Sequence, residues 1–345
     1  MLTPSEAFRK FRSKLELTQG EQDDASRRQK EIRGLMNGAF KIADDFLTGS
    51  YKRWTKTKPL KDVDIFCVFH DDERPKYRNN KHPSVVLAAA EKVLIDQYGR
   101  ERVHKQRRSV TVDFPHRSDE ELVISSDVVP AFTKSSHYQI PDIATTSGWT
   151  ETNPKVHEEK ATAANAAFGG EWKGMVRMAK SWNRAKDKPV KPSFLFEVMA
   201  LDILRPPFGG DFPYEFLAFF ATAADRIDEN WPDPAGLGPP VSDSMNATER
   251  AAAKRALTEA HNMMREAIEL SRAGQNGDAL RKYRDLFGDF FPLSWRPYDR
   301  PHRPIFPELP TTAQRRGSAH HRCPARSRHT HLAGYRESWL RPHRG

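Results

Sequence analysis

Asp62 and Asp64 stand two positions apart in the segment LTGSYKRWTKTKPLKDVDIFCVF, residues 47–69. They open a short apolar run rich in β-forming residues, which predicts a strand. Because side chains alternate along a strand, both carboxylates are expected on one face, a few ångströms apart. The spacing therefore favours two carboxylates that bind one ligand together.

Two carboxylates this close repel each other unless a divalent cation compensates their charge. Mg²⁺ is favoured because it prefers oxygen ligands and completes its coordination with water and substrate phosphates. A third acid, Asp127, lies in the apolar segment ISSDVVPAF, which we expect to form a strand beside the first. Three such acids would hold two Mg²⁺ ions, with Mn²⁺ as a substitute, that activate a hydroxyl and steady a triphosphate.

Gly49 and Ser50, upstream of the acids, are suited to phosphate binding. Glycine lets the backbone approach a ligand closely, Ser50 carries a hydroxyl, and backbone N–H groups would face a phosphate if a short helix began there. Taken alone, a D-x-D pair is more often a solvated strand edge, Ser50 a turn residue and Asp127 a strand-end cap. The combination of all these features favours catalysis.

The apolar periodicity predicts helices over residues 4–19 and 21–47. A strand from Asp62 is followed by a helix in HPSVVLAAAEKVLIDQYG that ends at Gly99, and then by two strands, in RVHKQRRSVTVDF and ELVISSDVVPAF. After about residue 155 helical segments dominate, and from residue 292 the chain is rich in Pro, Arg and His.

These patterns predict three regions. Residues 1–155 form an α/β catalytic lobe with N-terminal helices, residues 156–291 form a mostly helical lobe, and residues 292–345 form a tail expected to be disordered. The tail contains several His and Cys323, but these lack the paired ligand spacing of a zinc site. With Cys67 as the only other cysteine, a disulfide framework is excluded.

The charge and hydropathy restrict the classes of function. The net charge is +10, but residues 314–345 contain eight Arg and a single acid, so the remaining chain is only mildly basic. That balance argues against a long nucleic-acid substrate. No apolar run is long enough to span a membrane, and the N-terminus lacks a signal-peptide core, so we expect a cytoplasmic protein without a membrane partner.

The pattern Gly49-Ser50, Asp62-Val63-Asp64 and Asp127 resembles the signature of nucleotidyltransferases with the DNA polymerase β fold. Together with RMAKSWNR and KPSFLFEVMAL, it looks most like the CD-NTase family. These are bacterial cyclic-oligonucleotide synthases related to cyclic GMP-AMP synthase and oligoadenylate synthase. The resemblance covers roughly residues 5–290. It implies an α+β fold in which a polymerase β-like lobe with a mixed sheet is joined to a helical lobe.

The resemblance also implies roles for two residues of the helical lobe. Lys180 and Ser193 match a Lys and a helix-starting Ser that hold the donor triphosphate. A Lys acts as a point charge on phosphate, and a Ser at a helix N-terminus adds a hydroxyl to the positive end of the dipole. The alternatives are a solvated helix charge for Lys180 and a simple N-cap for Ser193. Arg177, one turn before Lys180, is a weaker candidate.

The implied function is Mg²⁺-dependent synthesis of a cyclic di- or trinucleotide from NTPs, with release of pyrophosphate, in CBASS-type anti-phage defence. ATP is the favoured substrate, and the second base stays open. A downstream effector and a regulatory protein are the expected partners. Two alternatives remain: a transferase that adds nucleotides to RNA, a protein or an antibiotic, and a catalytically dead relative that acts as a scaffold. The intact set of three acids argues against the second alternative.

Overall fold

The computed structural model describes residues 2–58, 60–114 and 125–293. They fall within one compact unit, Met1–Arg296. The predicted disordered tail, with its His residues and Cys323, lies outside the described residues apart from Pro292 and Leu293. Among the described residues, no helix is both long and apolar enough to cross a membrane.

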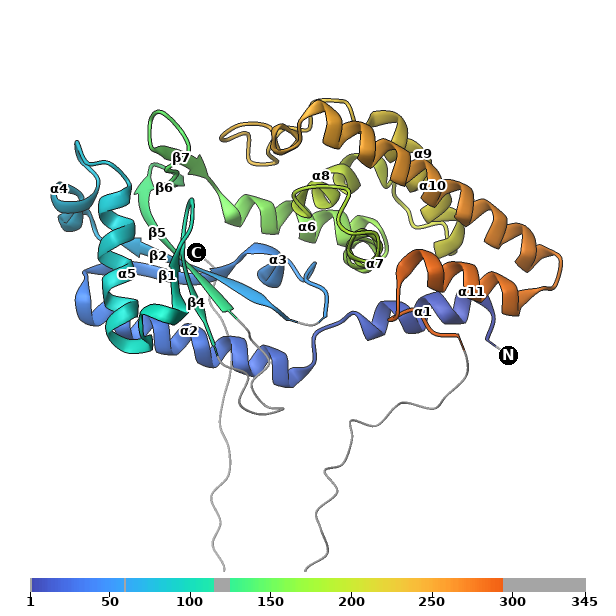
Figure 1. Ribbon diagram of the computed structural model, residues 1–345, viewed down its shortest axis with the longest axis horizontal. Coiled ribbons are helices and arrows are strands. Elements are labelled where there is room, and N and C mark those ends of the chain that lie inside the picture. The colour runs from blue at the N-terminus through green and yellow to red at the C-terminus, as the bar shows by residue number, and fades with distance from the viewer. Residues whose placement is uncertain (1, 59, 115–124, 294–345) are drawn as a thin grey trace, which may run out of the picture. The chain divides into compact units, whose positions relative to one another are not determined.

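The described strands form one mixed sheet in the order β1-β2-β5-β4-β3, with β6 joining β5 to β7 (Figure 1). Only β2 and β5 pair in parallel; the other pairs are antiparallel. The strands are β1 (Ile42–Thr48), β2 (Asp62–Phe69), β3 (Val103–Lys105), β4 (Val110–Asp113), β5 (Ser125–Lys134), β6 (His137–Pro141) and β7 (Trp149–Thr152).

Helices α2 (Gln19–Ala39) and α5 (Ser84–Tyr98) pack on one face of this sheet (Figure 1). Val63, Ile65 and Cys67 of β2 point into that core, because alternate residues of a strand share a face. The acids of β2 therefore lie on the opposite face, with Phe66 and Val68. Short elements complete the lobe: α3 (Gly49–Lys52), α4 (Arg74–Tyr77), η1 (Asp71–Glu73) and η2 (Arg100–Arg102).

A second apolar core lies among the later helices. These are α6 (Pro154–Ala167), α7 (Trp172–Ala185), α8 (Phe194–Ile203), α9 (Phe212–Arg226), α10 (Ala247–Arg272) and α11 (Asn276–Phe287), with η3 (Val241–Ser244) before α10. Helix α1 (Pro4–Lys14) packs into the same core through Phe8, whose ring meets those of Tyr283 and Phe287. The boundary at residue 155 stays a prediction, but α1 packs with the later helices.

The predicted α+β class is confirmed, and α5 with Gly99 at its C-cap lies where the sequence predicts it. The helix predicted over residues 21–47 is wrong beyond Ala39, because residues 42–48 form β1 and pair with β2. The first strand predicted after Gly99 is a hairpin, β3 and β4, and strands β6 and β7 were not predicted. Strand pairing decides the conformation in each case, because β1 pairs with β2, β3 with β4 and β6 with β7, and apolar periodicity alone does not reveal these pairs.

Candidate active site

The strand register brings the three predicted acids together. Asp64 pairs with Thr48 of β1 on one side and with Asp127 of β5 on the other, and Asp62 lies on the same face two residues earlier. Burial raises the pKa of Asp64 to about 6, and the charges of Asp127 and Asp62 add to this shift. Burial also raises the pKa of Asp127, although a hydrogen bond donated by the Thr111 hydroxyl opposes the change. The cluster therefore concentrates negative charge.

Gly49 is required by the position of Asp64. Its φ angle is +67°, in the left-handed region that favours glycine, and a Cβ atom built on it would lie 1.7 Å from Oδ2 of Asp64. Ser50 follows in the four-residue helix α3, as expected for a short helix at this step. Its carbonyl accepts the backbone N–H groups of Thr55 and Lys56, both at 3.0 Å, which fixes the turn after the helix.

The chemistry of the acid cluster fits a divalent cation. Burial and neighbouring negative charges raise the pKa values of Asp64 and Asp127, and a metal ion would remove the repulsion among the acids. As the side chains stand, no group of three or more His, Cys, Asp or Glu in the described residues is arranged to hold a metal. The Asp62 carboxylate instead pairs with Lys56, whose Nζ lies 2.6 Å from Oδ1.

A basic cavity of about 400 Å³ lies beside Asp62. It brings together Ser50, Lys180 and Ser193, three of the four residues predicted to bind phosphate, whereas the fourth, Gly49, borders a different cavity. Its lining includes six basic side chains: Lys56, Lys61, Lys180, Arg184, Lys188 and Lys191. Ser193 precedes α8, and within the described structure its side chain makes no capping hydrogen bond. Its hydroxyl is therefore not committed to the helix end.

Lys180 lines the basic cavity, but its ammonium already has partners. Nζ lies 2.6 Å from Oε1 of Glu197 and donates long hydrogen bonds to the carbonyl and hydroxyl of Thr55. Arg53 binds the same carboxylate at 2.7 Å. Burial lowers the pKa of Lys180; it also opposes ionisation of Glu197, yet the two cations hold the Glu197 pKa well below its usual range. Lys180 would have to exchange a partner to bind phosphate directly.

Two arginines on α7 hold the loop that carries Lys56. Arg177, the weaker candidate, donates to the Trp54 carbonyl at 2.6 Å and to Glu16 at 2.8 Å, and it does not line the basic cavity. One turn beyond Lys180, Arg184 donates to the Lys58 carbonyl at 2.6 Å and to the Thr57 hydroxyl. These contacts indicate that Arg177 acts on the loop, not on a ligand in the basic cavity.

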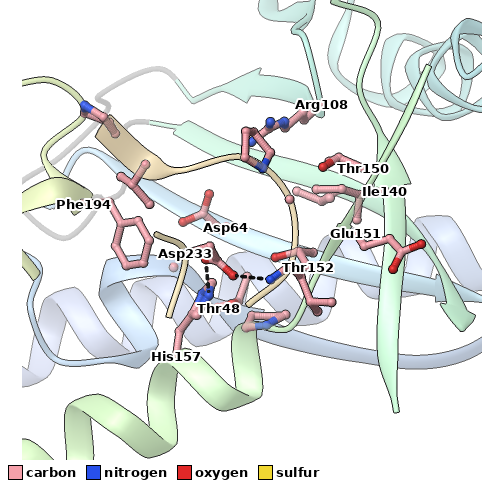
Figure 2. Close-up of a pocket in the computed structure, with 18 of the residues that line it drawn as sticks. Thr48, Asp64, Arg108, Ile140, Thr150, Glu151, Thr152, His157, Phe194 and Asp233 are labelled. Carbon is pink, nitrogen blue, oxygen red and sulfur yellow. Dashed lines mark hydrogen bonds and ion pairs between the residues drawn. The ribbon is translucent and has the colours of Figure 1, made fainter. Parts of the chain in front are cut away.

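A second cavity, of about 360 Å³, borders Asp64 (Figure 2). We call it the loop-lined cavity because residues 237–241 of the loop before α10 form part of its wall. Asp64 and Gly49 border it, and Phe66 and Phe194 give it aromatic surface. Its remaining apolar side chains include Val129, Ile140, Leu237 and Val241.

The loop of this cavity is fixed by a side-chain hydrogen bond. Nε2 of His157 on α6 lies 2.7 Å from Oδ1 of Asp233, and both side chains are largely buried. Oδ2 of Asp233 accepts the backbone N–H groups of Ala235 and Leu237. A third cavity, of about 520 Å³, contains Asp62 and Asp127 together with Arg107 and Arg108. The carboxylates therefore border all three cavities.

Sequence reasoning missed Lys56, Arg53 and Glu197. Lys56 and Arg53 lie in the basic turn after Gly49-Ser50, and Glu197 is a single acid within the apolar segment FLFEVMAL. A charged residue in such a segment needs a buried partner, so Glu197 was a signal that could have been used. Its partners come from distant segments and could not have been named.

Comparison with known proteins gives the family. Residues 1–165 match the Second Messenger Oligonucleotide or Dinucleotide Synthetase domain. A probable cyclic nucleotide synthase of Bacillus cereus (strain VD146) is 27% identical over 71% of this chain and 81% of its own length. The cyclic AMP-AMP-AMP synthase of an Acinetobacter strain is 26% identical over 72% and 73%, respectively.

The fold is similar to that of solved structures. The CdnC protein of E. coli MS115-1, in complex with HORMA-deltaN, aligns over 84% of this chain and 98% of its own, with a TM-score of 0.63 and 19% identity. The domain match spans both strands that carry the acids, and the two relatives align with more than two thirds of this chain. The domain match and the two relatives, together with the shared fold, therefore support membership of the CD-NTase family of nucleotidyltransferases.

Proposed function

We propose that this chain is a Mg²⁺-dependent synthase that joins NTPs into a cyclic di- or trinucleotide and releases pyrophosphate. The observation that carries the proposal is the clustering of Asp62, Asp64 and Asp127 on paired strands, where Asp62 borders a basic cavity and Asp64 borders a cavity with aromatic walls. The first suits a triphosphate and the second suits a nucleoside. Two aligned relatives bear the names of cyclic nucleotide synthases.

Asp62, Asp64 and Asp127 are the residues that would hold Mg²⁺, or Mn²⁺ in its place. The ions would supply Lewis-acid stabilisation of the charge on the transferring phosphoryl group. The cations of the basic cavity bind the β- and γ-phosphates, assisted by the hydroxyls of Ser50 and Ser193. Lys180 contributes positive charge to the same cavity, and Glu197 orients it.

The bond-forming step requires an acceptor hydroxyl beside the α-phosphate. Asp127, whose carboxylate accepts a hydrogen bond from the Thr111 hydroxyl, accepts the proton of the acceptor hydroxyl. The hydroxyl oxygen bonds to the α-phosphorus, the bond from that phosphorus to the bridging oxygen breaks, and pyrophosphate leaves. The same step is repeated on the reoriented linear product, once for a dinucleotide and twice for a trinucleotide, and the last repeat closes the ring.

The substrate and partner proposals follow the same relatives. The Acinetobacter relative is named for three AMP units, which supports ATP as a substrate here and leaves a second base open. The structure of the E. coli protein with a HORMA protein supports a regulatory protein as a partner of this chain. A soluble cyclic product acting on a separate effector, in the cytoplasm and in anti-phage defence, completes the proposal.

The test is incubation of the full chain with Mg²⁺ and each mixture of labelled NTPs, followed by phosphatase treatment and mass spectrometry. A phosphatase-resistant cyclic product is expected, and the Asp62→Asn, Asp64→Asn double variant should yield neither this product nor pyrophosphate while staying folded. A labelled macromolecule would point to the alternative transferase. An active double variant, or a wild-type protein that consumes no NTP, would overturn the assignment.

A further inference from the structure

Lys56 is a cation in direct contact with the acid cluster. Its Nζ atom lies 2.6 Å from Oδ1 of Asp62, and only 15% of its side chain is exposed. Its charge also opposes the rise in the pKa values of Asp64 and Asp127, so it acts on the whole cluster. Lys56 thus partly supplies the positive charge that a bound metal ion would supply.

The backbone of Lys56 is held firmly while its side chain spans two environments. The Lys56 N–H donates to the Ser50 carbonyl at 3.0 Å. On one side Lys180 contacts Thr55, and on the other Arg184 binds the Thr57 hydroxyl. Movement at this position is therefore confined to the long and flexible lysine side chain.

The same side chain lines the basic cavity with Ser50, Lys180 and Ser193. A triphosphate in that cavity would offer Lys56 a second anionic partner, with more negative charge than one carboxylate. Transfer of the ammonium from Asp62 to the phosphate would free a carboxylate oxygen next to the incoming phosphate. Both positions lie within reach of one side chain, since Asp62 itself lines the cavity.

We propose that Lys56 couples metal binding to nucleotide binding. Without a nucleotide, Lys56 neutralises Asp62 and competes with the metal ion for its carboxylate. When a triphosphate enters, Lys56 moves to the phosphate and Asp62 becomes a full metal ligand. This inference rests on the proposed function for the assignment of the acids as metal ligands.

The test is Mn²⁺ titration of the nucleotide-free full chain, followed by electron paramagnetic resonance of the free ion. Lys56→Met should tighten Mn²⁺ binding about tenfold, a change equivalent to about 1.4 kcal/mol. Lys61→Met is the matched control, because it removes the same charge from the same cavity and Lys61 is exposed. Its effect should stay below about threefold, as expected for a screened surface charge.

A second titration uses a non-hydrolysable NTP analogue. The analogue should tighten Mn²⁺ binding less in Lys56→Met than in the wild type, because the variant has no lysine to displace. Equal Mn²⁺ affinities for Lys56→Met and Lys61→Met, or weaker binding by Lys56→Met, would overturn the proposal. If Asp62→Asn leaves Mn²⁺ affinity unchanged, the metal assignment itself is wrong, whereas coupling without a cyclic product would contradict only the product assignment.

Discussion

The basic cavity and the loop-lined cavity, which border Asp62 and Asp64 respectively, differ in chemistry. The lining of the basic cavity contains six Lys and Arg residues and no aromatic side chain, whereas the loop-lined cavity has Phe66 and Phe194 with several aliphatic side chains. Asp62 borders the first and Asp64 the second. The difference supports the proposal that the basic cavity binds the phosphates and the loop-lined cavity binds the nucleoside, with the reacting α-phosphate at the acids.

The cavities also differ in how their walls are held. In the basic cavity, Asn183 exchanges two hydrogen bonds with the backbone of Val190, which fixes the loop before α8. In the other, the His157–Asp233 pair and Arg250, which donates to the Ser242 carbonyl, fix the loop before α10. Both loops belong to the later helices, while the acids belong to the sheet, so each cavity needs both parts of the chain.

The largest effect is expected at Gly49, which borders the loop-lined cavity beside Asp64. Gly49→Ala would place a methyl group on the Asp64 carboxylate and impose strain at φ +67°. Because a displacement of about 1 Å at a reacting centre costs about 100-fold, we expect that loss in the rate of pyrophosphate release.

Gly34→Ala is the control for this change, since a Cβ atom there meets nothing within 4 Å. In the exposed interior of α2 it should stabilise the protein by about 0.5–1 kcal/mol and leave the rate unchanged. If both variants keep full activity, Gly49 does not set the position of Asp64.

The Phe194→Ala variant tests whether the loop-lined cavity binds the nucleoside and not the phosphates. A base stacked on an aromatic ring gains about 1–3 kcal/mol, so the affinity for an NTP analogue should fall about tenfold. The affinity for tripolyphosphate, which has no base, should not change. Calorimetry with both ligands measures the difference, and an equal loss for both would mean that Phe194 does not contact the nucleoside.

Lys188→Met tests the basic cavity in the same assay. Lys188 is exposed, so removal of its charge should lower the affinities for the NTP analogue and for tripolyphosphate by only about threefold. The loss should be smaller at high salt. Lys186→Met removes a charge two residues away, outside the lining of this cavity, and should change neither affinity. A loss for the NTP analogue alone would contradict the division between the cavities.

The smallest expected effect is on stability and pH. The pKa of Asp64 is raised to about 6, so the metal-free folded protein keeps a proton that the unfolded chain releases at lower pH. Stability therefore falls as the pH rises from about 4 to about 6, and the loss is complete above about pH 6.

The Asp64→Asn variant has no carboxyl group at this position, so it should not lose stability over this pH range. In EDTA it should melt about 2 °C or more above the wild type at about pH 8 and at the same temperature at about pH 4. Thermal unfolding at both values tests this, and a variant that melts below the wild type at the higher pH would contradict the raised pKa.

The sequence was informative where chemistry is local. Asp62, Asp64, Gly49 and Ser50 lie within one short segment, and the alternation of a strand was enough to place both acids on one face. Asp127 was found because its own apolar segment indicated a strand, and its pairing with Asp64 is now observed.

The contacts that orient the site were not predictable in the same way. Glu197 on α8 binds Arg53, which lies more than a hundred residues earlier in the chain. It also binds Lys180, which lies on the preceding helix, α7. Similarly, residues 42–48 have a helical apolar spacing but form β1, because pairing with β2 satisfies their backbone. Such features depend on which distant segments meet.

The packing of α1 has a consequence for the order in which the protein matures. Phe8 and Phe11 near the start of the chain pack against Phe287 and Phe291 near the end of the described residues. During synthesis, all three acids emerge long before Phe287 and Phe291. The apolar face of α1 that packs against these two residues stays uncovered until then. The apolar core that α1 shares with the later helices therefore cannot be completed in a nascent chain until residue 291 has emerged.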